Sequence, residues 1–148
     1  MGLLSRNTND VKWGRPFGLR PASRPACRKI RVRNETRDTL VAESADVAND
    51  SHSRRKGLLG RDGLAPGEGL WIVPCESVHT WCMKFPIDLV YLDRKNRVRK
   101  LRRGMVPWRI SMCLLACSVL EFPAGTIARS ATQLGDQFVL SPCVSPLD

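Results

Sequence analysis

Short apolar segments separated by turn-forming residues limit what this chain can fold into more than any other feature. Some of these segments alternate charged and apolar residues, and others are continuous apolar runs. Alternation with a period of two is typical of a half-buried strand, and a short continuous run is typical of a buried one. Such segments occur at 29–33, 40–47, 70–73, 86–93, 97–103, 118–122 and 137–140. The pattern predicts a mostly β (α+β) fold, a small closed or partly closed β-barrel of about seven short strands with one or two short helices near 50–59 and 126–134.

The length of 148 residues suits a single domain with its own core. Residues 1–27 hold three prolines and scattered arginines with no apolar period, which predicts a disordered basic N-terminal arm. That arm is either a solvated tail, a mis-assigned start or an electrostatic contact arm. Residues 28–142 are then a single β-rich domain, and residues 143–148 are a C-terminal tail.

No apolar run approaches the ~18 residues that a membrane-spanning helix needs, and the N-terminus lacks the apolar core of a signal peptide. We therefore expect no transmembrane segment and a cytoplasmic location. In that compartment the six cysteines should be reduced thiols rather than disulfides. Two of them, Cys113 and Cys117, have helical spacing, which predicts that they share a buried face.

Five motifs in a fixed order resemble one known family. They are Arg54–Arg61 (RRKGLLGR), Gly67–Leu70 (GEGL), Val78–Asp93 (VHTWCMKFPIDLVYLD), Val119–Gly125 (VLEFPAG) and Gly135–Asp136 (GD). In sequence and order they are similar to the bacterial and archaeal domain of unknown function 192. The resemblance implies a compact, β-rich prokaryotic domain over roughly residues 30–141. Because that family is uncharacterised, the resemblance implies no activity.

A loop rich in titratable side chains is the first candidate site. Residues 75–88 combine cysteine, histidine, lysine and acidic residues beside apolar strands, which is a common composition for a binding pocket. We expect the pocket to include His79, Trp81, Met83, Lys84, Asp88, Glu121, Arg54 and Arg61. The motifs contain no complete catalytic triad or metal-ligand set, so no catalytic residue is assigned. The composition favours a non-enzymatic module that binds a small polar ligand or a peptide.

Three acidic residues, Asp88, Glu121 and Asp136, lie at or inside predicted strands, where an unpaired charge is costly. One alternative is a hydrolase-like enzyme in which Asp88 or Glu121 works with His79 as acid or base. The structural interpretation, which we favour, pairs the acids with Arg54, Arg61 or Lys84 or with backbone amides at turns.

Metal and thiol chemistry have weaker support. Cys75, His79 and Cys82 are of ligand types that suit zinc, but their spacing matches no standard site and a fourth ligand is missing. Cys75 and His79 also lack the third group that orients a catalytic thiol and its base. We therefore expect no metal and no cofactor.

A run of basic residues forms the second candidate surface. Residues 94–109 contain eight lysines and arginines and no acid, a net charge of +8. The run begins as the return strand of a hairpin, and charge on both faces of a strand predicts a sheet edge. The predicted basic patch comprises Arg97, Arg99, Lys100, Arg102, Arg103 and Arg109. An acidic protein partner or a solvated face is the preferred interpretation, and nucleic acid is the alternative, because aromatic residues do not alternate with the basic ones.

Overall fold

The computed structural model describes residues 29–143. The arm predicted at 1–27 and all but the first residue of the predicted tail lie outside the described residues. The described part forms nine strands and two short helices, which confirms the predicted mostly β class. In chain order these are β1 (Lys29–Asn34), β2 (Thr39–Ala48), α1 (Ser51–Lys56), β3 (Glu68–Ile72), β4 (Ser77–His79), β5 (Ile87–Leu92), β6 (Val98–Met105), β7 (Ile110–Met112), β8 (Ser118–Pro123), α2 (Thr126–Arg129) and β9 (Phe138–Pro142).

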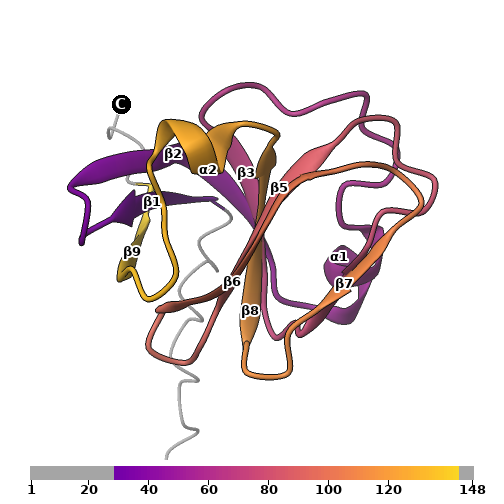
Figure 1. The fold of residues 1–148 in the computed structure, drawn as a ribbon. Helices are drawn as coiled ribbons and strands as arrows, with labels where there is room; N and C mark the ends of the chain where they lie inside the picture. Colours follow the sequence, from indigo (N-terminus) through magenta and orange to yellow (C-terminus); the bar gives the residue numbers. More distant parts are fainter. Residues whose placement is uncertain (1–28, 144–148) are drawn as a thin grey trace, which may run out of the picture.

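Seven of the strands form one curled sheet in the order β6-β5-β8-β3-β2-β1-β9. Neighbours are antiparallel except β2 and β3, which run parallel. The curl brings the two outer strands together at one end, where Val98 N donates to Asp136 O at 3.0 Å and Phe138 N donates to Asn96 O at 2.9 Å. The sheet is therefore a half-barrel that closes on one side, with β1, β2, β9 and α2 gathered there (Figure 1).

The two faces of the central strands pack into separate cores. On β5, Val90 and Leu92 point into the curl, while Leu89 and Tyr91 point to the opposite face. That opposite face is covered by the two-stranded ribbon of β4 and β7 and by the segment around α1, which lie on the other side of the molecule (Figure 1). Because β5 is covered on both faces, all of its residues are buried.

Helix α1 is shorter than the predicted 50–59. The Asp50 side chain caps its first turn by accepting from His52 N and Ser53 N, both at 2.9 Å. The helix ends at Lys56, because Gly57 has a φ of +48° that residues with a side chain rarely adopt.

Two expectations about local structure were wrong. The segment 75–88, expected to be a loop, contains β4, which pairs with β7 through Val78 and Ser111. The helical spacing of Cys113 and Cys117 does not make a helix, since a turn at Leu114 and Leu115 connects β7 to β8. Both thiols are half-buried rather than packed on one buried helix face.

Candidate functional site

A cleft of about 560 Å³ lies between the α1 segment and β4. Apolar side chains form much of its wall, and its polar groups come from α1, from the loop before β4 and from β8. The lining residues used below are Arg54, Leu58, Cys75, Val78, His79, Met83 and Glu121.

Glu121 lies on β8 between two other strands, opposite Leu70 of β3 and Leu89 of β5. Its side chain faces the cleft but is only 4% exposed. Within residues 29–143 no hydrogen bond or ion pair reaches its carboxyl group. Burial raises the pKa of Glu121 to about 8, although the positive charge of Arg61 opposes this shift. At neutral pH the group is therefore a carboxylic acid, which can both donate and accept a hydrogen bond.

The rim of the cleft supplies a cation and a thiol. Arg54 is half-buried and donates through Nη1 to Asn49 O at 3.1 Å. The Cys75 thiol donates to Ser77 O at 3.1 Å. Burial raises the pKa of Cys75, so this sulfur stays a protonated thiol and is a poor nucleophile at neutral pH.

Four of the eight predicted pocket residues line this cleft: Arg54, His79, Met83 and Glu121. The other four, Arg61, Trp81, Lys84 and Asp88, do not. Lys84 forms an exposed ion pair with Asp62 at 2.6 Å, and Arg61 pairs with Asp46 at 2.9 Å. Trp81 stacks on His79 with 5.0 Å between ring centroids, outside the cleft wall.

Asp88 holds backbone segments together. Its Oδ1 accepts from Gly104 N at 2.8 Å, and its Oδ2 accepts from Gly125 N at 3.1 Å and from Ile127 N at 2.8 Å. The side chain is 1% exposed, so this carboxylate satisfies three amides and is closed to solvent. It ties the end of β6 to the start of α2.

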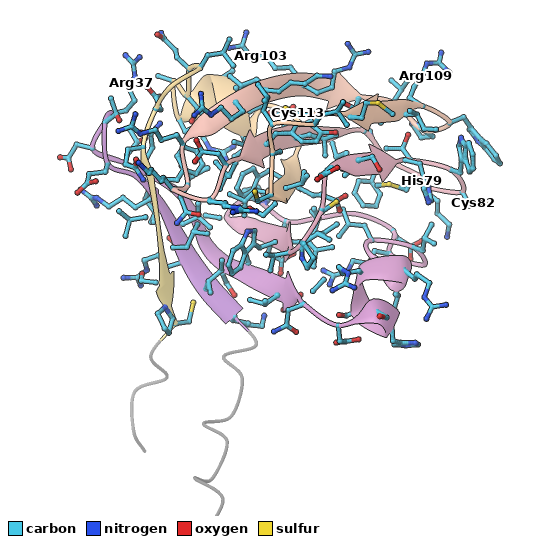
Figure 2. All side chains as sticks on the ribbon, turned by 90° about the horizontal axis from the view of Figure 1, so that it is seen from below. Arg37, His79, Cys82, Arg103, Arg109 and Cys113 are labelled. Carbon is cyan, nitrogen blue, oxygen red and sulfur yellow. The ribbon has the colours of Figure 1, made fainter. Side chains whose placement is uncertain are left out.

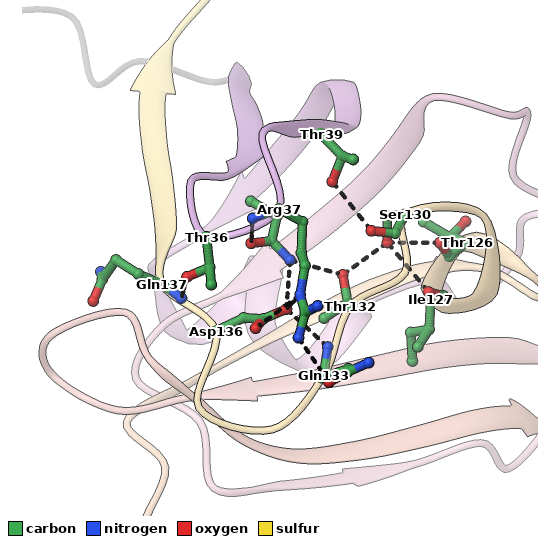
Figure 3. A network of polar contacts seen from close by, with 11 residues as sticks. Thr36, Arg37, Thr39, Thr126, Ile127, Ser130, Thr132, Gln133, Asp136 and Gln137 are labelled. Atoms are coloured by element: carbon green, nitrogen blue, oxygen red, sulfur yellow. Dashed lines mark hydrogen bonds and ion pairs between the residues drawn. The ribbon is translucent and has the colours of Figure 1, made fainter.

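Asp136 has a comparable role where the sheet closes (Figure 3). Its carboxylate accepts from Asn34 Nδ2 at 2.8 Å, from Gln133 N at 2.9 Å and from Arg37 Nε at 3.2 Å. Burial alone would raise the pKa of Asp136, but these three hydrogen bonds and the arginine charge lower it.

His79 is exposed and, within the described part, donates no hydrogen bond to Asp88 or Glu121. No group of three histidine, cysteine or acidic side chains in residues 29–143 is arranged to hold a metal ion. Cys75, His79 and Cys82 thus do not gather as ligands, and Cys82 lies in the exposed turn after β4 (Figure 2).

Several cleft residues were not predicted from the sequence. Arg55, Lys56 and Leu58 line the wall together with Ile72 and Val78. The first three belong to the motif at 54–61, whose position beside the 75–88 loop depends on the fold. The motif at 54–61 was the signal in the sequence that could have identified these cleft residues, because its basic and apolar residues lie on either side of a single turn.

The predicted basic patch lies mainly on β6, at one edge of the sheet as expected. A shallow hollow of about 470 Å³ is lined there by Arg99, Lys100, Leu101, Arg102, Arg103 and Leu134. Arg99 forms an ion pair with Asp93 at 2.7 Å, and Lys100 donates to Met112 O at 2.7 Å. Arg109 lies apart from Arg103, near the ribbon and His79 (Figure 2).

Comparison with known proteins gives a family and a fold. The sequence model of DUF192, described as an uncharacterised ACR, matches residues 32–140. The crystal structure of a candidate transcription regulator from Sinorhizobium meliloti 1021 is similar at a TM-score of 0.67 and 22% identity, over 76% of this chain and 92% of that one. A protein of unknown function from Novosphingobium aromaticivorans DSM 12444 is similar at 0.62 and 20%, over 75% and 83%. No curated protein matches the chain significantly. Within residues 29–143, no helix is long and apolar enough to cross a membrane.

Proposed function

The chain belongs to the DUF192 family of uncharacterised proteins, and for this member we propose a non-enzymatic role in which the cleft between α1 and β4 binds a small polar ligand. The observation that carries this proposal is the buried carboxyl group of Glu121, which faces the cleft and has no hydrogen-bond or ion-pair partner within residues 29–143. A buried polar group without a partner is costly, and proteins retain such groups mainly where a ligand or water satisfies them.

The wall of the cleft indicates the class of ligand. A volume of about 560 Å³ lies within the range of small-molecule sites, roughly 300–1,000 Å³. Leu58, Val78 and Met83 offer apolar contact, and Arg54 offers a positive charge at the rim. The ligand that fits has an apolar body, a hydrogen-bonding group for the Glu121 acid and a negative group for Arg54.

A hydrolase that uses His79 with a carboxylate is less well supported. Asp88 is occupied by three backbone amides, and Glu121 makes no hydrogen bond to His79. A base also needs a partner that orients it, and His79 stacks on the exposed Trp81 instead. The arrangement therefore favours binding over catalysis.

The test is a ligand screen read residue by residue. Backbone amide NMR spectra of the full chain would be recorded with small monocarboxylates, phosphate monoesters and neutral amides. We expect at least one monocarboxylate or phosphate monoester to shift the signals of Leu58, Val78 and Glu121. Binding should weaken as the pH rises above about 8, because ionised Glu121 then repels the anion.

Glu121→Gln is the matched variant, since it keeps the shape of the side chain and cannot ionise. Its affinity for the same probe should not depend on pH in that range. Shifts confined to residues outside the cleft, or no shift with any probe class, would contradict the proposal.

A further inference from the structure

Exposed apolar side chains gather on and beside the β4–β7 ribbon in the described part. These residues, which we call the ribbon face, are Trp81, Trp108, Ile110, Met112, Leu114 and Leu115. Trp108 is 62% exposed and Ile110 is 60% exposed, while Leu114 and Leu115 in the following turn are 77% and 73% exposed. Isolated exposed apolar residues are ordinary, but five of them within residues 108–115 are typical of an interaction site.

The pairing of the ribbon explains why Ile110 and Met112 share its exposed face. Ile110 lies opposite His79, and Met112 lies opposite Ser77. Paired residues point to the same side of a sheet, and all four of these are exposed, whereas Val78 and Ser111 between them are buried. Stacking of Trp81 on His79 extends the face past the end of β4.

The charges along the chain on either side of β7 are all of one sign, whereas the exposed Glu76 lies next to β4. Residues 94–118 contain no aspartate or glutamate. Lys100 and Arg102 of β6 pair with Tyr91 and Leu89, whose side chains pack on the ribbon side of the sheet. The Lys100 ammonium also donates to Met112 O of β7, and the exposed Arg109 directly precedes β7. A partner of this face must therefore accept apolar side chains next to a dense positive charge.

We propose that the ribbon face docks on the surface of an anionic lipid bilayer. Tryptophan is favoured at the level of the headgroups, because its ring has both an apolar body and a hydrogen-bond donor. The two leucines and Ile110 gain by entering the acyl-chain boundary, and the basic side chains are attracted to anionic headgroups. Docking of this kind lays the ribbon on the bilayer and involves no membrane-spanning helix.

Other partners fit these features less well. Nucleic acid would use the positive charges and the tryptophans, but it offers nothing for the exposed Leu114 and Leu115. A second copy of the chain would bring two basic β6 edges close together, and like charges repel. These partners are separate outcomes of the test.

The test is co-sedimentation of the full chain with vesicles of phosphatidylcholine, alone or mixed with phosphatidylglycerol. We expect binding to the mixed vesicles, little binding to phosphatidylcholine alone, and a loss of binding with added salt. The emission of Trp81 and Trp108 should shift to shorter wavelength when the mixed vesicles bind.

Leu114→Ser with Leu115→Ser should lower the vesicle partition coefficient about tenfold or more, since the two most exposed apolar groups are removed. Leu40→Ser is the control, because Leu40 is exposed on β2 away from the ribbon. Arg102→Gln with Arg109→Gln should weaken binding to the mixed vesicles more than Arg31→Gln with Arg129→Gln, which removes the same charge from exposed positions elsewhere.

Three results would overturn the proposal. One is the absence of binding to either kind of vesicle. Another is binding that the leucine pair does not change, because charge alone would then hold the protein on the bilayer. The third is a requirement for the same leucines in self-association or in DNA binding, without vesicle binding.

Discussion

Three acidic side chains in residues 29–143 are buried, and they differ in the groups that hydrogen-bond to their oxygens. Asp88 accepts from three backbone amides, and Asp136 accepts from Asn34, Arg37 and Gln133. Glu121 has no such partner in the described part and borders a cleft. Both aspartates therefore hold backbone amides, as the structural interpretation made from the sequence expects, but the charged partner of Asp136 is Arg37 and not Arg54, Arg61 or Lys84. Glu121 departs from that interpretation, which is why it carries the proposed site.

The ionisation of Glu121 gives a prediction for stability against pH. Its folded pKa of about 8 lies above the unfolded value near 4.5. Between these values the folded state binds the extra proton, so the free energy of unfolding falls as the pH rises from about 5 to about 8 and then levels off. Each unit of pKa difference corresponds to ~1.4 kcal/mol. Urea unfolding of the wild type and Glu121→Gln across this range would measure the effect.

Glu121→Gln should remove that part of the pH dependence, and other titrating groups cancel in the difference between the two proteins. The two curves should therefore converge toward pH 5, and the variant should be the more stable protein at pH 8. Parallel curves would mean that Glu121 is already ionised in the folded state.

At the scale of elements, strands with several alternating or apolar residues were predictable. The runs predicted at 86–93 and 118–122 are β5 and β8, and the basic return strand is β6 at the sheet edge. Strands β4 and β7 were missed because three residues are too few to show alternation. Their pairing is a tertiary contact between segments about thirty residues apart.

The same limit applies to the site. The sequence placed His79, Met83 and Glu121 in a pocket because each lies in a motif with polar and apolar neighbours. It also included Lys84 and Asp88, whose partners Asp62 and Gly104 come from other parts of the chain. Whether a charged side chain faces a cleft or a partner depends on those distant residues. Local pattern alone cannot separate the two cases.

Gly69 on β3 shows how a motif residue serves packing between strands. A Cβ atom there would lie 2.8 Å from the Phe122 ring of β8, closer than real contacts allow. Gly69→Ala should therefore lower the free energy of unfolding by about 1–3 kcal/mol, the usual cost of overpacking a core. Chemical denaturation would measure the change.

Gly63→Ala is the matched control, since its Cβ would meet no atom within 4 Å. We expect this variant to unfold like the wild type or slightly later, because alanine restricts the unfolded chain. If Gly69→Ala lowered the free energy of unfolding no more than Gly63→Ala does, the Phe122 ring would be shown to move aside without cost.

At the scale of the whole molecule, the half-barrel closes at one side, and the β4–β7 ribbon and α1 lie at the other side (Figure 1). Residues of β4 and of the α1 segment line the cleft. Closure joins the start of β6 to the residues before β9, which are far apart in sequence. Asp136 lies at this junction, where its backbone oxygen accepts from Val98 and its carboxylate holds Arg37 and Asn34 (Figure 3). The closed side thus stabilises the sheet on whose other side the ribbon and the cleft lie.

Removing the Asp136 carboxylate should open this side first. Asp136→Asn keeps the size of the side chain but presents an amide to donors, so we expect a loss of roughly 1.5–3 kcal/mol in the free energy of unfolding. Hydrogen exchange should accelerate at the Val98 and Phe138 amides, which donate across the junction, more than at the Tyr91 amide in the centre of the sheet. Hydrogen exchange at the amides of β4 and β7 should be the same in Asp136→Asn as in the wild type.

The pH dependence of closure follows from the lowered pKa of Asp136. A depressed folded pKa adds stability that is present above the unfolded value near 3.8 and is lost as the pH falls through the folded pKa. Protonation of Asp136 in acid should therefore lower the free energy of unfolding of the wild type, and Asp136→Asn lacks this contribution. The difference in free energy of unfolding between the two proteins should shrink below about pH 4. Asp62→Asn, which breaks only an exposed ion pair with Lys84, should leave stability nearly unchanged across the same range. A difference between wild type and Asp136→Asn that stayed constant down to the lowest pH would show that the aspartate charge does not hold the closed side together.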